Sequence, residues 1–144
     1  MMKNLILILA ATTLLTFCQT NKSSESNTLA EPTIAELKTE VLAIHDEVMP
    51  KMGELRRARK DLMLQADSLT ESNPERAAIL NAAADELGSA NDGMMQWMRA
   101  YEPEFEGTEE EIREYLEAQK TSIQEVKENM LGSLEKGREI LANE

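Results

Sequence analysis

The sequence predicts an all-α protein: an up-down-up antiparallel three-helix bundle, or a long helical coiled coil, that follows a signal peptide and a flexible tether. Three observations support this fold class. Apolar residues recur at steps of three and four along three long segments, and only a helix gathers such a spacing on one face. Short breaks that contain proline or glycine separate the segments, which favours antiparallel neighbours. No segment shows the alternation typical of a strand.

Residues 1–17 are predicted to be a lipoprotein signal peptide. Lys3 precedes an apolar run over residues 5–15. That run is too short for about 30 Å of hydrocarbon, because a spanning helix needs roughly 20 apolar residues. We therefore interpret it as the apolar core of an export signal and exclude it from the fold.

Cys18, the single cysteine, follows Leu15-Thr16-Phe17 at the position of a lipoprotein processing site. Cleavage before Cys18 would leave its sulfur as the attachment point for acyl chains, which hold a protein to a membrane stably when two or more are present. Phe17 is bulkier than the usual small residue, and it resembles a variant tolerated in Bacteroidetes-type lipoproteins. The alternative is a signal or core cysteine without chemistry.

Residues 18–32 are expected to form the acylated end and a tether, since they are rich in serine, asparagine and threonine and have no apolar period. Random-coil scaling gives such a tether a reach of roughly 20 Å. Residues 33–144 then form one helical domain that is long enough to bury a core of its own.

The first helix is predicted over residues 33–71. Thr33 and Glu36 have the spacing of a capping box. Pro50 lies within the segment, where it removes an amide donor and crowds the carbonyl of Asp46, so we expect a kink near Met49. The apolar face consists of Ile34, Leu37, Val41, Ile44, Val48, Met52, Leu55, Leu62 and Leu69.

The second and third helices are predicted over residues 74–101 and 108–142. Pro74 suits the first turn of a helix, and Thr108 begins an acidic first turn that the helix dipole favours. The second apolar face consists of Leu80, Ala83, Leu87, Ala90, Met94, Trp97 and Tyr101. The third consists of Ile112, Leu116, Gln119, Ile123, Val126, Met130, Leu134 and Leu141.

The formal net charge of −12 excludes nucleic acid as an expected partner, because such a field repels phosphate backbones. Six glutamates lie within residues 102–111. They lack the spacing of a calcium loop, so a solvated acidic face is favoured. Antiparallel pairing about the turn near residue 72 places the basic cluster, which is Arg56, Arg57, Arg59 and Lys60, level with Asp85 and Glu86. We predict intramolecular pairing there, and the alternative is a docking patch for lipid or protein.

The same pairing gathers the only histidine with several methionines. His45, Met49 and Met52 share one face of the first helix, and Met95 and Met98 lie level with them on the second. Thioether and imidazole groups are ligands for Cu(I) or Ag(I), and the Trp97 ring could shield such a cation. Ordinary core packing is the favoured reading, because Met63 and Met130 are expected to be core where no histidine is near. A methionine-rich partner surface is a third possibility.

No enzyme is predicted. A single histidine excludes an HExxH pair and the two Glu-x-x-His motifs of a di-iron bundle. No serine occurs in a nucleophile-elbow pattern.

With HDEVMPKMGEL over residues 45–55 and ANDGMMQWMRAYE over residues 90–102, the chain resembles small Bacteroidetes lipoproteins often labelled "viral A-type inclusion protein". That label reflects coiled-coil composition and implies no viral role. The resemblance covers the signal and most of the helical region. It implies an exported helical lipoprotein and supplies no activity or binding residues.

The sequence thus predicts a lipoprotein that is lipid-anchored in the cell envelope of a Gram-negative bacterium, at the outer membrane or periplasmic face. Its helical domain would be a binding or structural module without a cofactor. The expected partners are the membrane, through the anchor, and an envelope protein or a second copy of the chain. The alternative function is a Cu(I) or Ag(I) binding protein that uses the histidine and methionine cluster.

Overall fold

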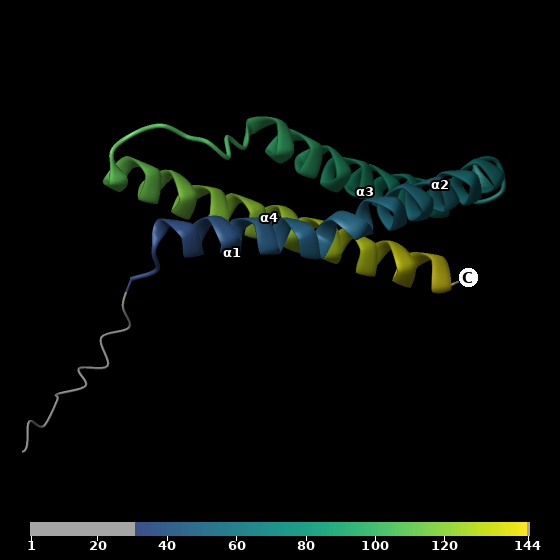
Figure 1. Ribbon diagram of the computed structural model, residues 1–144. Helices are drawn as coiled ribbons and strands as arrows, with labels where there is room; N and C mark the ends of the chain where they lie inside the picture. The colour runs from purple at the N-terminus through teal and green to yellow at the C-terminus, as the bar shows by residue number, and fades with distance from the viewer. Residues whose placement is uncertain (1–30, 144) are drawn as a thin grey trace, which may run out of the picture. The chain divides into compact units, whose positions relative to one another are not determined.

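The computed structural model describes residues 31–143, and every regular element in that range is helical (Figure 1). The elements are α1 (Ile34–Val48), the 3-10 helix η1 (Met49–Lys51), α2 (Met52–Leu69), α3 (Pro74–Ala100) and α4 (Glu109–Ala142). The predicted all-α bundle is confirmed. The predicted signal peptide, Cys18 and nearly all of the tether lie outside the described residues. None of the helices described is both long and apolar enough to span a membrane.

Local sequence signals set where the helices begin. Thr33 and Thr108 each accept a hydrogen bond from the backbone N–H three residues later, and the glutamate at that position bonds back to the threonine N–H. Both are complete capping boxes, which satisfy amide groups that have no partner within the helix. The Asn73 side chain accepts from the Arg76 N–H at 3.1 Å, and Pro74 opens α3. The sequence predicts that helices start at these three places.

The first predicted helix is interrupted at Pro50, as expected. Pro50 lies in η1, where the chain makes one turn of 3-10 helix before α2 begins at Met52. The Met49 N–H still bonds to the His45 carbonyl, so the backbone bends but does not unfold. In Figure 1, α1 and α2 consequently follow one another as two arms with different directions.

Because of the bend, α1 and α2 pack against different helices. α1 packs mainly against α4, whereas α2 packs mainly against α3, and α3 and α4 also pack together. Ion pairs from Glu40 to Lys120 (2.5 Å) and from Glu47 to Lys127 (2.7 Å) join α1 to α4. The pairing about the turn near residue 72 does not predict this packing of α1 on α4, although the His45–Trp97 stack keeps one predicted contact between α1 and α3. The reason is that pairing about a turn assumes a straight helix.

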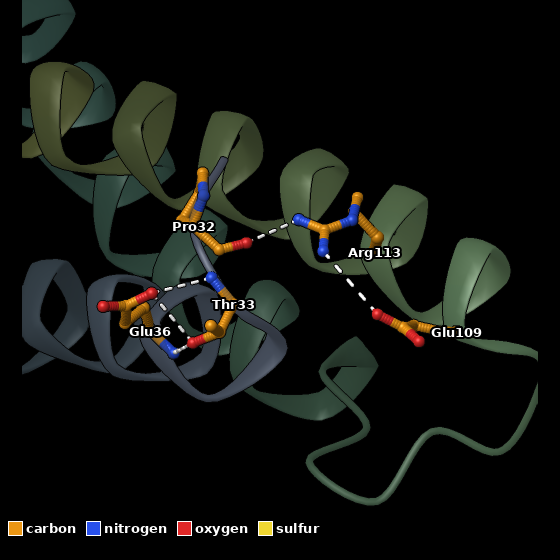
Figure 2. A network of polar contacts seen from close by, with 5 residues as sticks. All are labelled: Pro32, Thr33, Glu36, Glu109 and Arg113. Atoms are coloured by element: carbon orange, nitrogen blue, oxygen red, sulfur yellow. Dashed lines mark hydrogen bonds and ion pairs between the residues drawn. The ribbon is translucent and has the colours of Figure 1, made fainter. Parts of the chain in front are cut away.

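The start of α1 is also fixed on α4 (Figure 2). The Arg113 guanidinium of α4 donates to the Pro32 carbonyl at 2.5 Å, and it lies 3.9 Å from the Glu109 carboxylate. Directly after Pro32, the Thr33 and Glu36 capping box begins the helix. The start of α1 is thus held by both a local and a long-range contact.

The core is aliphatic along most of its length, and no polar or charged residue among those described is fully buried. The predicted apolar faces supply most of it. One prediction fails, since Met63 is 43% exposed on the outer surface of α2 and is not core. The buried hydrophobic residues are Leu37, Val41, Val48, Met52, Leu55, Leu62, Ala66, Ala77, Leu80, Ala83, Ala84, Leu87, Ala90, Met94, Trp97, Leu116, Ile123, Met130 and Leu134.

Gly137 is a core residue that the apolar pattern does not reveal. It is buried in α4, where a Cβ atom would lie 3.2 Å from Leu87 Cδ1 and 3.6 Å from Leu62 Cδ1. The glycine therefore allows α4 to approach α2 and α3 closely.

Candidate functional site

The candidate site lies where α1 meets the second half of α3, around the only histidine. The His45 ring stacks against the Trp97 indole, with ring centres 5.6 Å apart and planes inclined by 29°. His45 Nδ1 is 2.8 Å from Asp46 Oδ1, and 19% of the histidine side chain is exposed. With Nδ1 held by the carboxylate, Nε2 is the ring nitrogen left for another ligand.

The four predicted methionine ligands occupy three different environments. Met52 is buried in the core, while Met49 and Met98 are half-buried and pack against it. Met95 is 39% exposed on α3. The sequence predicted that these methionines lie at the same height on two neighbouring helices. It did not predict which of them are buried and which is exposed.

An aromatic ladder extends from the histidine and contains every aromatic side chain in the described part of the chain. Trp97 stacks on Tyr101 at 4.9 Å, Tyr101 on Tyr115 at 6.3 Å, and Tyr115 on Phe105 at 4.3 Å. The stack thus joins α1, α3, the α3–α4 connection and α4. Sequence reasoning missed the last two rings. The available signal was Phe105, the only large apolar side chain in the acidic stretch and so the one that must find cover.

Two polar atoms inside this ladder have no hydrogen-bond partner within the described residues, namely Trp97 Nε1 and the Tyr101 hydroxyl. The Tyr115 hydroxyl, in contrast, accepts from the Glu102 backbone N–H at 2.6 Å. Burial raises the pKa of Tyr101, and the nearby Tyr115 and Glu104 add to that rise. Buried polar atoms without partners are destabilising, and they are uncommon enough to mark a region for attention.

The acidic stretch is largely occupied by structural contacts. Glu111 closes a capping box, which lowers the pKa of its carboxyl group through hydrogen bonds from Thr108. Glu109 lies 3.9 Å from Arg113, and Glu104 lies 3.8 Å from Lys38. Over residues 31–143, no group of three or more histidine, aspartate and glutamate side chains converges as a site for a metal ion would require.

The basic cluster does not pair as predicted. Glu86 forms its ion pair with Lys136 of α4 at 2.5 Å. Within the described residues, no ion pair joins the cluster to Asp85 or Glu86. The prediction is wrong because it considered only the α2–α3 pair, whereas α4 brings its own lysine to the same carboxylate.

Fold and site together define a helical bundle with an aromatic and methionine-rich end and a separate basic surface. Comparisons with protein-family models, with curated proteins and with solved structures find no match for this chain. The resemblance to Bacteroidetes lipoproteins stays a prediction.

Proposed function

We propose that the chain is an exported lipoprotein that Cys18 fastens to a membrane of the cell envelope, with the helical domain acting as a binding or structural module. The observation that supports the proposal is how the start of the helical domain is held. The helical domain starts at Thr33, where the predicted tether ends, and Arg113 holds the preceding Pro32 carbonyl on α4. A start held in this way suits a domain that a flexible tether would attach to a membrane.

The lengths of the tether and of the bundle set how far the domain can reach from its anchor. The hydrogen bond from Arg113 to the Pro32 carbonyl joins the start of α1 to α4, so two helices hold the point at which the predicted tether meets the domain. α4 has 34 residues and is therefore about 50 Å long by the 1.5 Å rise of an α-helix. The tether would add roughly 20 Å.

Intact-mass measurement of the protein purified from its native membrane tests the anchor. We expect a species that begins at Cys18 and carries the added mass of acyl chains. A Cys18→Ala variant, in which only the sulfur is lost, is expected to keep its leader and to gain no lipid. A wild-type protein with an unprocessed leader, or one recovered free of membranes, would contradict the proposal.

The module part of the proposal predicts a specific protein partner or self-association. Crosslinking in intact envelopes, followed by mass spectrometry, should give the same crosslinked pairs in repeated samples. A Cys18→Ala variant expressed at an equal level is the control, since it keeps the domain but loses its location. Background proteins alone, in equal amounts from both variants, would count against a binding role.

A soft-metal site is the second candidate function, and the surroundings of His45 favour it. Asp46 orients the imidazole, Trp97 covers one face of it, and two half-buried thioethers, Met49 and Met98, belong to the same end of the bundle. An imidazole nitrogen and thioether sulfurs suit Cu(I), and an indole face can shield a cation.

Titration of the reduced protein with Cu(I) against a competing chelator tests this candidate. The site variant is Met49→Leu, Met95→Leu, Met98→Leu, and the matched control is Met63→Leu, an exposed methionine far along α2. We expect the site variant to weaken binding by at least about tenfold, or roughly 1.4 kcal/mol, and the control to leave it unchanged. Equal affinity for both variants would remove the metal site.

A further inference from the structure

One outward face of α2 combines positive charge with large apolar side chains. The basic-apolar stripe consists of Arg56, Arg59, Lys60, Met63 and Leu64, and these residues line one shallow depression together with Asp67. Steps of three and four place them along a single side of the helix. Leu64 is 58% exposed, the highest value among the exposed large hydrophobic residues of the described chain. This face of α2 is therefore exposed to solvent and is not part of the core.

The cations of this stripe have no acidic partner, which sets them apart from most others in the molecule. Within residues 31–143, the only other cations without an ion pair or hydrogen bond are Arg57, next to the stripe, and Arg99. The partnered cations are Lys38, Lys51, Arg76, Arg113, Lys120, Lys127, Lys136 and Arg138. Uncompensated positive charge is therefore concentrated on α2.

We propose that the basic-apolar stripe is the surface with which this protein lies on an anionic phospholipid bilayer. A helix face with arginine and lysine beside leucine and methionine matches such an interface, because the charges attract acidic headgroups while the apolar side chains enter the boundary region. Met63 and Leu64 follow Arg59 and Lys60 by one turn, so both kinds of contact form along the same line.

The negative charge of the rest of the chain favours the orientation in which this face of α2 contacts the bilayer. The chain carries a net charge of −12, so an anionic bilayer repels most orientations of the domain and attracts the one in which α2 faces the lipid. The inference rests on the proposed function in one respect only, in that the anchor would keep the stripe close to a bilayer. The attraction itself does not need the acyl group.

A probe on the stripe tests the inference independently of acylation. In the full chain with Cys18→Ser, an environment-sensitive fluorophore is attached through Leu64→Cys, or through Ala118→Cys on the exposed surface of α4 as a control. The vesicles contain phosphatidylcholine alone or phosphatidylcholine mixed with phosphatidylglycerol. We expect a blue shift at position 64 only with the anionic vesicles, its loss at high salt, and no shift at position 118.

Charge variants give the matched comparison in the same Cys18→Ser, Leu64→Cys background. Arg56→Gln, Arg59→Gln, Lys60→Gln removes three charges from the stripe, while Lys120→Gln, Lys127→Gln, Lys136→Gln removes three from α4. The stripe variant should weaken binding to anionic vesicles by at least about tenfold, since each basic residue near such a surface contributes favourably, and the α4 variant should have a much smaller effect. Thermal unfolding of both checks that they fold.

Three results would overturn the inference. They are equal shifts at positions 64 and 118, equal weakening by the two charge variants, and a stripe-dependent dimer in sedimentation without vesicles. The last would identify a second copy of the chain as the occupant. Failure here leaves the lipoprotein proposal standing, because intact mass measures acylation separately.

Discussion

Near the α2–α3 turn the core is mainly leucine and alanine, whereas at the other end aromatic rings and methionine join the aliphatic side chains. Leu62 and Leu80 are fully buried and have no polar atoms to satisfy. Trp97 and Tyr101 bring large rings to the other end, together with polar atoms that lack partners in the described chain. The two ends belong to the same bundle and share α3 and α4.

This difference affects how much each end of the bundle contributes to stability. Leucine and alanine fill space at the turn end, where the free energy of burial is not offset by polar groups. The aromatic end buries large area but also an indole N–H and a phenol, which stabilise fully only when they are bonded.

Leu62→Ala is expected to have the largest effect. Leu62 is fully buried at the turn end beside Gly137, so removal of its side chain leaves a cavity and should lower the free energy of unfolding by about 2–5 kcal/mol. Urea denaturation measures the loss. Met63→Ala, at the neighbouring exposed position, should change stability by less than about 0.5 kcal/mol. Similar losses for both variants would mean that burial of the Leu62 side chain does not stabilise the turn end as proposed.

Thr108→Ala is expected to lower the free energy of unfolding by about 0.5–2 kcal/mol, because α4 loses its capping hydroxyl. Thr33→Ala should do the same for α1, and Asn73→Ala supplies the comparison at the turn end. Equilibrium unfolding of the three variants checks whether caps contribute similarly at both ends. A negligible loss at Thr108 would show that tertiary packing alone fixes the start of α4.

Acid should weaken the aromatic end first, because both capping boxes lie there. Hydrogen bonds from the backbone N–H groups of Thr33 and Thr108, and then from their hydroxyl groups, lower the pKa of Glu36 and of Glu111, respectively. Since each folded pKa is depressed, the stabilisation is complete above the ordinary value of about 4.3 and is lost as the pH falls through the folded pKa. Thermal unfolding against pH should show this loss, and Glu36→Gln, Glu111→Gln should remove it, because the variant has no carboxyl group to titrate at either cap. An unchanged pH profile in that variant would contradict the assignment.

Tyr101→Phe is expected to raise the free energy of unfolding by about 1 kcal/mol, since it removes a buried hydroxyl without a partner. Tyr115→Phe should instead lower it by about 0.5–1.5 kcal/mol, because the Glu102 N–H loses its acceptor. Denaturant melts of the two variants provide the test. A loss at Tyr101 as large as that at Tyr115 would imply that the Tyr101 hydroxyl is satisfied in solution.

Gly132→Ala should give the smallest change, a gain of about 0.5–1 kcal/mol, because alanine favours helix and nothing lies within 4 Å of the added Cβ. At Gly137 the same substitution meets Leu87 Cδ1 at 3.2 Å, so the gain should shrink or reverse. Melting temperatures of both variants measure the difference. Equal gains would mean that α4 is not held as closely as the Gly137 contact requires.

The candidate site was only partly predictable. The sequence brought His45 close to the second half of α3, because pairing about the turn near residue 72 fixes which positions lie level. It did not reveal that Met95 is exposed, nor that Phe105 and Tyr115 extend the stack. Those facts depend on the path of the α3–α4 connection and on the rotation of each helix, and no short-range spacing encodes them.

By itself the sequence determined the helix ends and the apolar faces. Capping at Thr33, Asn73 and Thr108 and the bend at Pro50 arise from contacts between residues three or four apart, which the amino-acid order specifies directly. Only the tertiary structure decided that α1 packs on α4, and which cations remain unpaired on α2. These outcomes depend on competition between residues some 80 positions apart, such as Glu40 and Lys120, and that competition is resolved only when all the helices pack together.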